Sequence, residues 1–189
     1  MDLARGAPAP NAATPAIGAM RGGALGDFVL TLPAIAVLRS AFPGHVLRLI
    51  GRPDYLRLVR PDGFLDQDSA ALAPLYALQG TRPAGLRAFF AGVRFFMAYA
   101  AGPGPALAAH LADLVPGEVL LHDPQPPPGY QAHIGEHLLA PLRRRGFSVP
   151  EPVPCLRLQP EDREWAASCW ADLRLGLGPV LVQDRKSVV

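Results

Sequence analysis

Apolar residues are grouped in short blocks along the chain, and the blocks alternate between two spacings. Short uninterrupted apolar runs are typical of buried strands, whereas apolar residues three and four positions apart are typical of one helix face. The first spacing predicts strands at 16–20, 45–50, 64–68, 93–100, 118–122 and 180–182. The second predicts helices at 28–42, 54–59, 70–78, 82–91, 106–114, 133–145 and 161–175. Such alternation predicts an α/β fold, a parallel sheet with flanking helices and right-handed crossovers.

Two elements of this pattern are ambiguous. Gly18 weakens the first predicted strand, because glycine in a strand interior has no side chain to pack. The apolar run 93–100 reads as a buried strand, but a helix continuing from residue 82 fits the same residues.

Composition divides the chain into four parts. Residues 1–15, rich in Ala and Pro without a period, are expected to form a disordered leader. Residues 16–148 are expected to form one Rossmann-like domain. Residues 149–183, first Pro-rich and then helical, are expected to be a crossover and the start of a truncated second domain. Residues 184–189 hold Lys186, the only Lys among 18 basic residues, and resemble a translated sequencing adapter, so we interpret them as a non-native tail.

Overall composition excludes several classes of protein. Half of the residues are hydrophobic and 18% are charged, which is too apolar for a disordered protein. A net charge of +2 argues against a nucleic-acid partner, which requires a dominant basic surface. No secretory signal pattern is present, and the most apolar stretch, 86–101, is broken by Arg87 and Arg94. Cys155 and Cys169 are isolated, which favours a reduced, cytoplasmic setting.

A glycine-rich turn, residues 21–27, joins the first predicted strand to the following helix. Sites in parallel sheets lie at the carboxyl ends of strands, so chemistry is expected here. A phosphate-binding P-loop is rejected, because it requires a Lys followed by Ser or Thr. A dinucleotide site fits poorly, because the glycine spacing differs and Asp27 places a carboxylate where a phosphate would lie. Arg52 could contact a 2′-phosphate, so an NADP-binding oxidoreductase domain remains an alternative.

A third chemistry uses the acidic residue itself. Glycines let the backbone approach a sugar nucleotide, while Asp27, at the N-cap or in the first turn of the helix, acts as a general base. The competing interpretation is that Asp27 only caps the helix. Spacing alone favours the capping interpretation.

The string RGGALGDFVLTLPAI at 21–35, followed by Leu-Arg at 38–39 and Phe-Pro at 42–43, resembles the N-terminal signature of glycosyltransferase family 9. That family includes the ADP-heptose:lipopolysaccharide heptosyltransferases. The resemblance implies the N-terminal half of a GT-B fold and an inverting, metal-independent transfer of a sugar, with heptose suspected, and no cofactor. It implies a bacterial protein of lipopolysaccharide biosynthesis, located in the cytoplasm or at the cytoplasmic face of the inner membrane.

The resemblance also implies a set of partners and site residues. The donor is a nucleotide sugar, with ADP-heptose suspected, and the acceptor is a lipid-linked or core oligosaccharide. Asp27 would deprotonate the acceptor hydroxyl, and Gly22, Gly23 and Gly26 would lie at the donor phosphates and acceptor. Arg52 and Arg57 would meet an anionic acceptor, unless they belong to a solvated helix face. Because the donor half is mostly missing, the chain by itself is expected to be inactive.

A competing motif lies at 133–137, where His-Ile-Gly-Glu-His matches the inverted zinc-peptidase pattern HxxEH. Histidines four positions apart share a helix face and could bind zinc, with Glu136 as the base. Gly135 weakens the helix, and the Arg-rich last turn is an unusual neighbour for a cation. A zinc peptidase therefore remains the second alternative.

Overall fold

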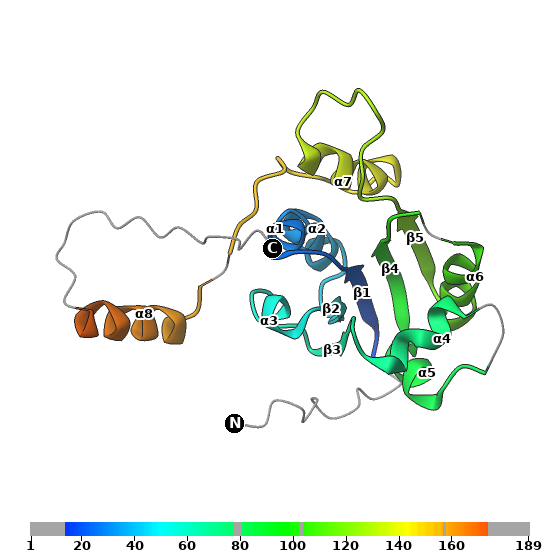
Figure 1. The fold of residues 1–189 in the computed structure, drawn as a ribbon, viewed down its shortest axis with the longest axis horizontal. Helices are drawn as coiled ribbons and strands as arrows, with labels where there is room; N and C mark the ends of the chain where they lie inside the picture. The colour runs from blue at the N-terminus through cyan, green and yellow to red at the C-terminus, as the bar shows by residue number, and fades with distance from the viewer. Residues whose placement is uncertain (1–13, 78–80, 103, 157, 174–189) are drawn as a thin grey trace, which may run out of the picture. The chain divides into compact units, whose positions relative to one another are not determined.

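The computed structural model describes residues 14–77, 81–102, 104–156 and 158–173 (Figure 1). The chain divides after Leu156 into two compact units, which are described separately below. The boundary predicted after residue 148 lies before this division, because Val149 packs on the core of the first unit and Pro152 lies against its last helix. The assignment of domains to residues stays a prediction.

The first unit is built on one sheet of five parallel strands. Its strands are β1 (Ala16–Arg21), β2 (Val46–Gly51), β3 (Gly63–Asp66), β4 (Val93–Tyr99) and β5 (Glu118–His122), in the order β3-β2-β1-β4-β5. The predicted α/β, Rossmann-like fold is confirmed, and the ambiguous run 93–100 is a strand. The predicted strand at 180–182, the tail 184–189 and nearly all of the leader lie outside the described residues.

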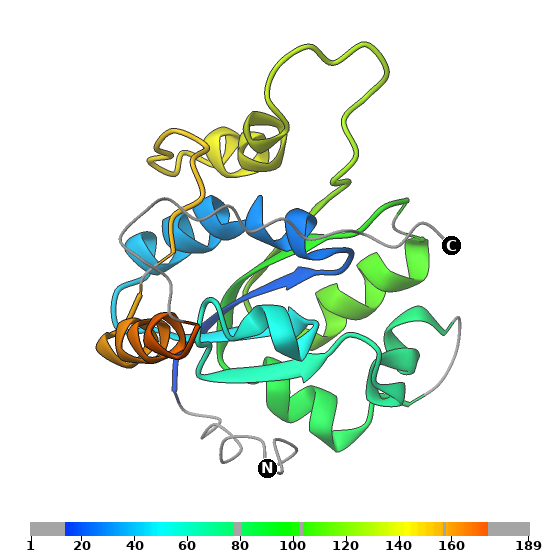
Figure 2. The same ribbon diagram turned by 60° about the vertical axis from the view of Figure 1, so that its left-hand side comes forward.

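Helices cover both faces of the sheet (Figures 1 and 2). One face carries α1 (Leu25–Val29), α2 (Leu32–Ala41), α3 (Pro53–Leu56) and α7 (Ile134–Arg144). The other carries the 3₁₀ turn η1 (Ala70–Leu72), α4 (Ala73–Tyr76), α5 (Ala84–Phe90) and α6 (Pro105–Leu114). A sheet buried on both faces explains why its strands read as continuous apolar runs.

Side chains of β1 alternate between the two faces. Ile17 and Ala19 pack under α1 and α2, and Met20 packs on the opposite side. Gly18 points to the same side as Met20, and a Cβ there would lie 2.5 Å from Cδ2 of Phe96. The glycine that weakened the strand prediction is therefore a packing requirement, because the ring of Phe96 occupies the space of its missing side chain.

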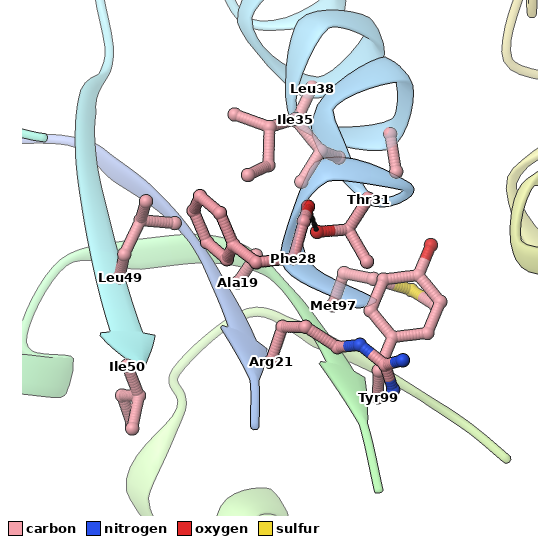
Figure 3. A pocket seen from close by; sticks show the side chains of 11 residues that line it. Ala19, Arg21, Phe28, Thr31, Ile35, Leu38, Leu49, Ile50, Met97 and Tyr99 are labelled. Carbon is pink, nitrogen blue, oxygen red and sulfur yellow. Dashed lines mark hydrogen bonds between the residues drawn. The ribbon is translucent and has the colours of Figure 1, made fainter. Parts of the chain in front are cut away.

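The helix predicted at 28–42 is wrong as a single element, because the structure divides it between Val29 and Leu32. At the break, Oγ1 of Thr31 donates a hydrogen bond to the carbonyl of Phe28, with an O···O distance of 2.6 Å (Figure 3). Pro33 then lies in the first turn of α2. Proline is tolerated there because the first helical N–H groups have no partner within the helix.

Arg48 is a charged residue in the middle of β2 that is fully buried. Its guanidinium donates hydrogen bonds to the carbonyls of Ala88, Phe89 and Ala91, at the end of α5 and in the turn that leads into β4. Burial lowers the pKa of this guanidinium. Arg48 thereby ties β2 to an element that is distant in sequence.

The second unit contains α8 (Pro160–Asp172). Its first turn is capped by Asp162, whose Oδ2 accepts a hydrogen bond from the Gln159 N–H at 2.8 Å. The side chains of Trp165 and Trp170 are exposed. Among the helices of the described residues, none has the length and apolar character needed to cross a membrane.

Candidate active site

A cleft of about 640 Å³ lies at the carboxyl ends of the strands, where the strand order reverses between β1 and β4. This reversal is the position at which open α/β sheets bind ligands. The cleft is lined by Met20, Arg21, Gly22, Gly23, Asp27, Leu30, Ile50, Gln67, Asp68, Leu72, Tyr76, Tyr99, Ala100, Ala101, Pro124, Gln125, Pro126 and Ile134. The glycine-rich turn therefore borders the cleft, as its place after β1 predicts.

Asp27 lies in the first turn of α1, three residues after the N-cap residue Ala24. Its Oδ2 accepts a hydrogen bond from the Ala24 N–H at 2.9 Å, and its Oδ1 lies 3.0 Å from Nη2 of Arg21. The side chain is 46% exposed. A carboxylate offers about four acceptor positions, so Asp27 can accept a further proton or hydrogen bond from a ligand in the cleft.

Arg21, the partner of Asp27, lies opposite Tyr99 in the register of β1 and β4 (Figure 3). Burial lowers the pKa of Arg21, while the nearby Asp27 raises it. The hydroxyl of Tyr99 donates a hydrogen bond to the carbonyl of Leu138 at 2.7 Å, and burial raises the pKa of Tyr99. Arg21 is thus a largely buried cation that pairs with Asp27 and neighbours a tyrosine fixed by its own hydrogen bond.

The three glycines predicted to bind substrate differ in whether the structure leaves room for a side chain. Gly23 has a φ of 99°, and a Cβ there would lie 2.6 Å from Oδ2 of Asp27. A Cβ at Gly22 would lie 3.3 Å from Oε1 of Gln67. These two glycines line the cleft, whereas Gly26 does not and a Cβ there would meet nothing within 4 Å. The ligand-binding role of all three stays a prediction.

Arg52 and Arg57 are not among the residues that line the cleft. The guanidinium carbon of Arg52 lies 5.5 Å from the ring centroid of Tyr55, and Arg57 is the exposed C-cap of α3. Their contact with an acceptor stays a prediction. The structure adds no support for the alternative of a dinucleotide site. The first turn of α1 already binds the Asp27 carboxylate, at the position where a pyrophosphate would lie.

The HxxEH motif is engaged in local contacts. Nδ1 of His133 accepts a hydrogen bond from the Gly135 N–H and thereby caps α7, and His137 donates from Nε2 to the carbonyl of Asp123. Glu136 pairs with Arg143. In the part of the chain that the structure describes, no group of three or more His, Cys, Asp or Glu residues could hold a metal ion. The described residues therefore provide no ligand set for a zinc peptidase.

Sequence reasoning missed the residues that border the cleft after β3. These are Gln67 and Asp68, which directly follow the strand, and Tyr76 at the end of α4. The rule that sites form at the carboxyl ends of strands could have found the first two. Tyr76 carried no such signal, because the folding of η1 and α4 onto the sheet places it there.

The fold is similar to the crystal structure of a glycosyl transferase family 9 protein from Veillonella parvula, with a TM-score of 0.52. The sequences are 13% identical, and the alignment covers 86% of this chain and 51% of that one. The chain therefore spans about half of the length of that structure, and at this identity the likeness establishes the fold. No protein-family model matches the chain, and no curated protein matches it in sequence.

Proposed function

We propose that the chain is the acceptor-side domain, the N-terminal half of a GT-B fold, of an inverting glycosyltransferase. The observation that carries this proposal is the position of Asp27, a half-exposed carboxylate in a cleft at the strand-order reversal. Support comes from the likeness in fold to half of a family 9 structure and from the resemblance of residues 21–43 to the family signature.

In the proposed reaction, Asp27 takes the proton of an acceptor hydroxyl as its oxygen bonds to the anomeric carbon of the donor sugar. The bond from that carbon to the nucleotide diphosphate breaks on the opposite face, the nucleotide keeps the electron pair, and the configuration inverts. General-base assistance of this kind typically contributes about 10²–10⁴-fold. Arg21 and the Ala24 N–H hold the carboxylate in position, and Gly22 and Gly23 leave the turn free of side chains.

The finer assignment rests on the sequence resemblance. It makes ADP-heptose the donor and a lipopolysaccharide core glycan the acceptor, at the cytoplasmic face of the inner membrane. In this proposal, most of the donor is bound by a domain other than the described first unit. Arg52 and Arg57 would reach an anionic part of the acceptor outside the cleft.

Binding by the chain tests the acceptor assignment. We expect a core oligosaccharide to shift the amide NMR signals of residues 21–27, and NADP to leave them almost unchanged. A nucleotide that binds tightly at this turn, with no glycan binding, would overturn the proposal in favour of a dinucleotide site.

Turnover tests the role of Asp27. In a two-domain enzyme that contains this chain, Asp27→Asn should lower sugar transfer at least about 100-fold, while glycan binding is retained. The matched control is Asp54→Asn, because Asp54 is another exposed acid in the first turn of a helix and lies outside the cleft. Equal activity of both variants would show that Asp27 is only a helix-capping residue.

A further inference from the structure

One side of the cleft is formed by three residues, Gln67, Asp68 and Tyr76, which we call the β3 wall. Gln67 and Asp68 directly follow β3, and Tyr76 ends α4. The wall borders the glycine-rich turn, because the Gln67 side chain lies against Gly22. A ligand that reaches Asp27 along the cleft is therefore placed next to this wall.

The charges that line the cleft do not suit an anion. Its charged residues, among those the structure describes, are Arg21, Asp27 and Asp68. The cation is already paired with Asp27, which leaves the carboxylate of Asp68 as the excess charge. Arg52 and Arg57, the cations that sequence reasoning assigned to an anionic acceptor, lie outside the cleft lining. A phosphate or carboxylate on an acceptor residue beside Asp68 would meet like charge, and the described lining residues hold no further cation to offset it.

The wall offers hydrogen-bond acceptors and an aromatic face instead. Oε1 of Gln67 is buried and has no hydrogen-bond partner, which is a costly state for a polar atom. The exposed carboxylate of Asp68 also accepts hydrogen bonds. The ring of Tyr76 is 57% exposed although it borders a concave surface. An uncharged pyranose is complementary to these groups. Its O–H groups donate hydrogen bonds to the acceptors, and its C–H face packs against the aromatic ring.

We propose that the β3 wall selects the acceptor of the reaction: the sugar residue held beside Asp27 is an uncharged pyranose, and a phosphate or carboxylate on that residue is rejected. This inference rests on the proposed function, because it assigns the cleft to the acceptor glycan. Anionic groups elsewhere on the glycan, outside the cleft, are compatible with it.

The test compares two synthetic ligands on the full chain, a neutral heptose disaccharide and the same disaccharide with one phosphate on its terminal residue. Isothermal titration should give about tenfold tighter binding of the neutral ligand, with the difference shrinking as salt is raised. Asp68→Asn should reduce this preference, and Asp68→Lys should remove it or reverse it. Asp113→Asn is the matched control, because Asp113 is an exposed acid of α6 away from the cleft, and it should leave the preference unchanged.

Two further variants separate recognition by the wall from charge alone. Gln67→Ala and Tyr76→Ala should weaken binding of the neutral disaccharide several-fold, with folding confirmed by circular dichroism. Equal or tighter binding of the phosphorylated ligand to the unmodified chain would overturn the inference and leave the proposed function intact. Failure of both disaccharides and of core oligosaccharide to bind would overturn the proposed function together with it.

Discussion

Arg21 and Asp27 form an ion pair whose two sides differ in exposure. Nη2 of Arg21 lies 3.0 Å from Oδ1 of Asp27, and the side chains are 12% and 46% exposed, respectively. The buried cation fixes the position of the pair, while the carboxylate stays open to the cleft. An ordinary surface ion pair adds little to stability, but here one partner is held by the surrounding packing.

Removing the Arg21 cation should therefore lower the free energy of unfolding by more than a typical surface substitution does. Arg21→Met is expected to lower the free energy of unfolding by about 1.5–3 kcal/mol, the usual range for hydrogen bonds to charged groups. Arg21→Lys should retain part of this, because it keeps the charge without the planar fork of donors. Urea denaturation measures both variants, and Arg57→Met, at an exposed cap, is the control expected within about 0.5 kcal/mol of the unmodified chain. An equal, small loss in all three would show that the ion pair is not held as described.

Two glycines of the same turn should respond in opposite ways to alanine. Gly23→Ala combines a φ of 99° with a Cβ only 2.6 Å from Oδ2 of Asp27, so a loss of at least about 1–2 kcal/mol is expected. Gly26→Ala adds a methyl group in open space within α1 and should be neutral or stabilising by up to about 1 kcal/mol. Thermal unfolding of the two variants provides the comparison. A destabilising Gly26→Ala would contradict the assignment of this residue to an unstrained helix.

Arg48 should be among the most sensitive positions of the first unit. Arg48→Met keeps an apolar stem but leaves the carbonyls of Phe89 and Ala91 without their donor, and an unsatisfied buried acceptor costs about 1–3 kcal/mol. Arg94→Met is the matched control, because Arg94 is a strand arginine with an exposed side chain and should be nearly neutral. Chemical denaturation distinguishes the two. Similar midpoints would mean that the buried guanidinium contributes no net stability.

Stability should fall on mild acidification because of His122. Its ring lies 4.5 Å from that of His137, between centroids, and its Nε2 donates a hydrogen bond to the His137 carbonyl at 3.1 Å. Burial, followed by the proximity of His137, lowers the pKa of His122 below 6.5, and Arg144 acts in the same direction. The hydrogen bond to the His137 carbonyl and the nearby Asp123 oppose this shift.

Because the unfolded chain then binds the proton more readily, the stability contributed by His122 is complete above pH 6.5. It decreases as the pH falls below that value toward the pKa of the folded state. Replacement of His122 with Gln should reduce the change in the free energy of unfolding between about pH 7 and pH 5, measured by denaturation at each pH. An unchanged pH dependence would assign the effect to other groups.

The architecture could be predicted from sequence because the three central strands, β1, β2 and β4, are buried on both faces. Burial on both faces makes a strand a continuous apolar run, and the alternation of such runs with helical spacing leaves few topologies. The same reasoning places Asp27 correctly, because a glycine-rich turn after the first strand of a parallel sheet opens at its carboxyl edge. Local pattern and tertiary structure agree at these positions.

Other features depend on contacts between distant parts of the chain, and local patterns do not reveal them. Arg48 is polar in an otherwise apolar strand, and it is buried because its acceptors lie about forty residues further along. Tyr76 lines the cleft and Arg52 does not. Both positions depend on how the short helices α3 and α4 fold back on the sheet. The break at Thr31 was missed because the apolar spacing continues across it, while the Thr31 hydroxyl binds the Phe28 carbonyl.

The close approach of Gly23 to Asp27 means that the two positions cannot vary independently. Once Asp27 is shortened to alanine, a Cβ at position 23 no longer meets Oδ2, and chiefly the cost of its backbone angle remains. The combined substitution should therefore destabilise the chain by less than the sum of the two single changes. A side chain at residue 23 therefore destabilises the chain least when Asp27 has already been replaced. The residues allowed at position 23 thus depend on the residue at position 27.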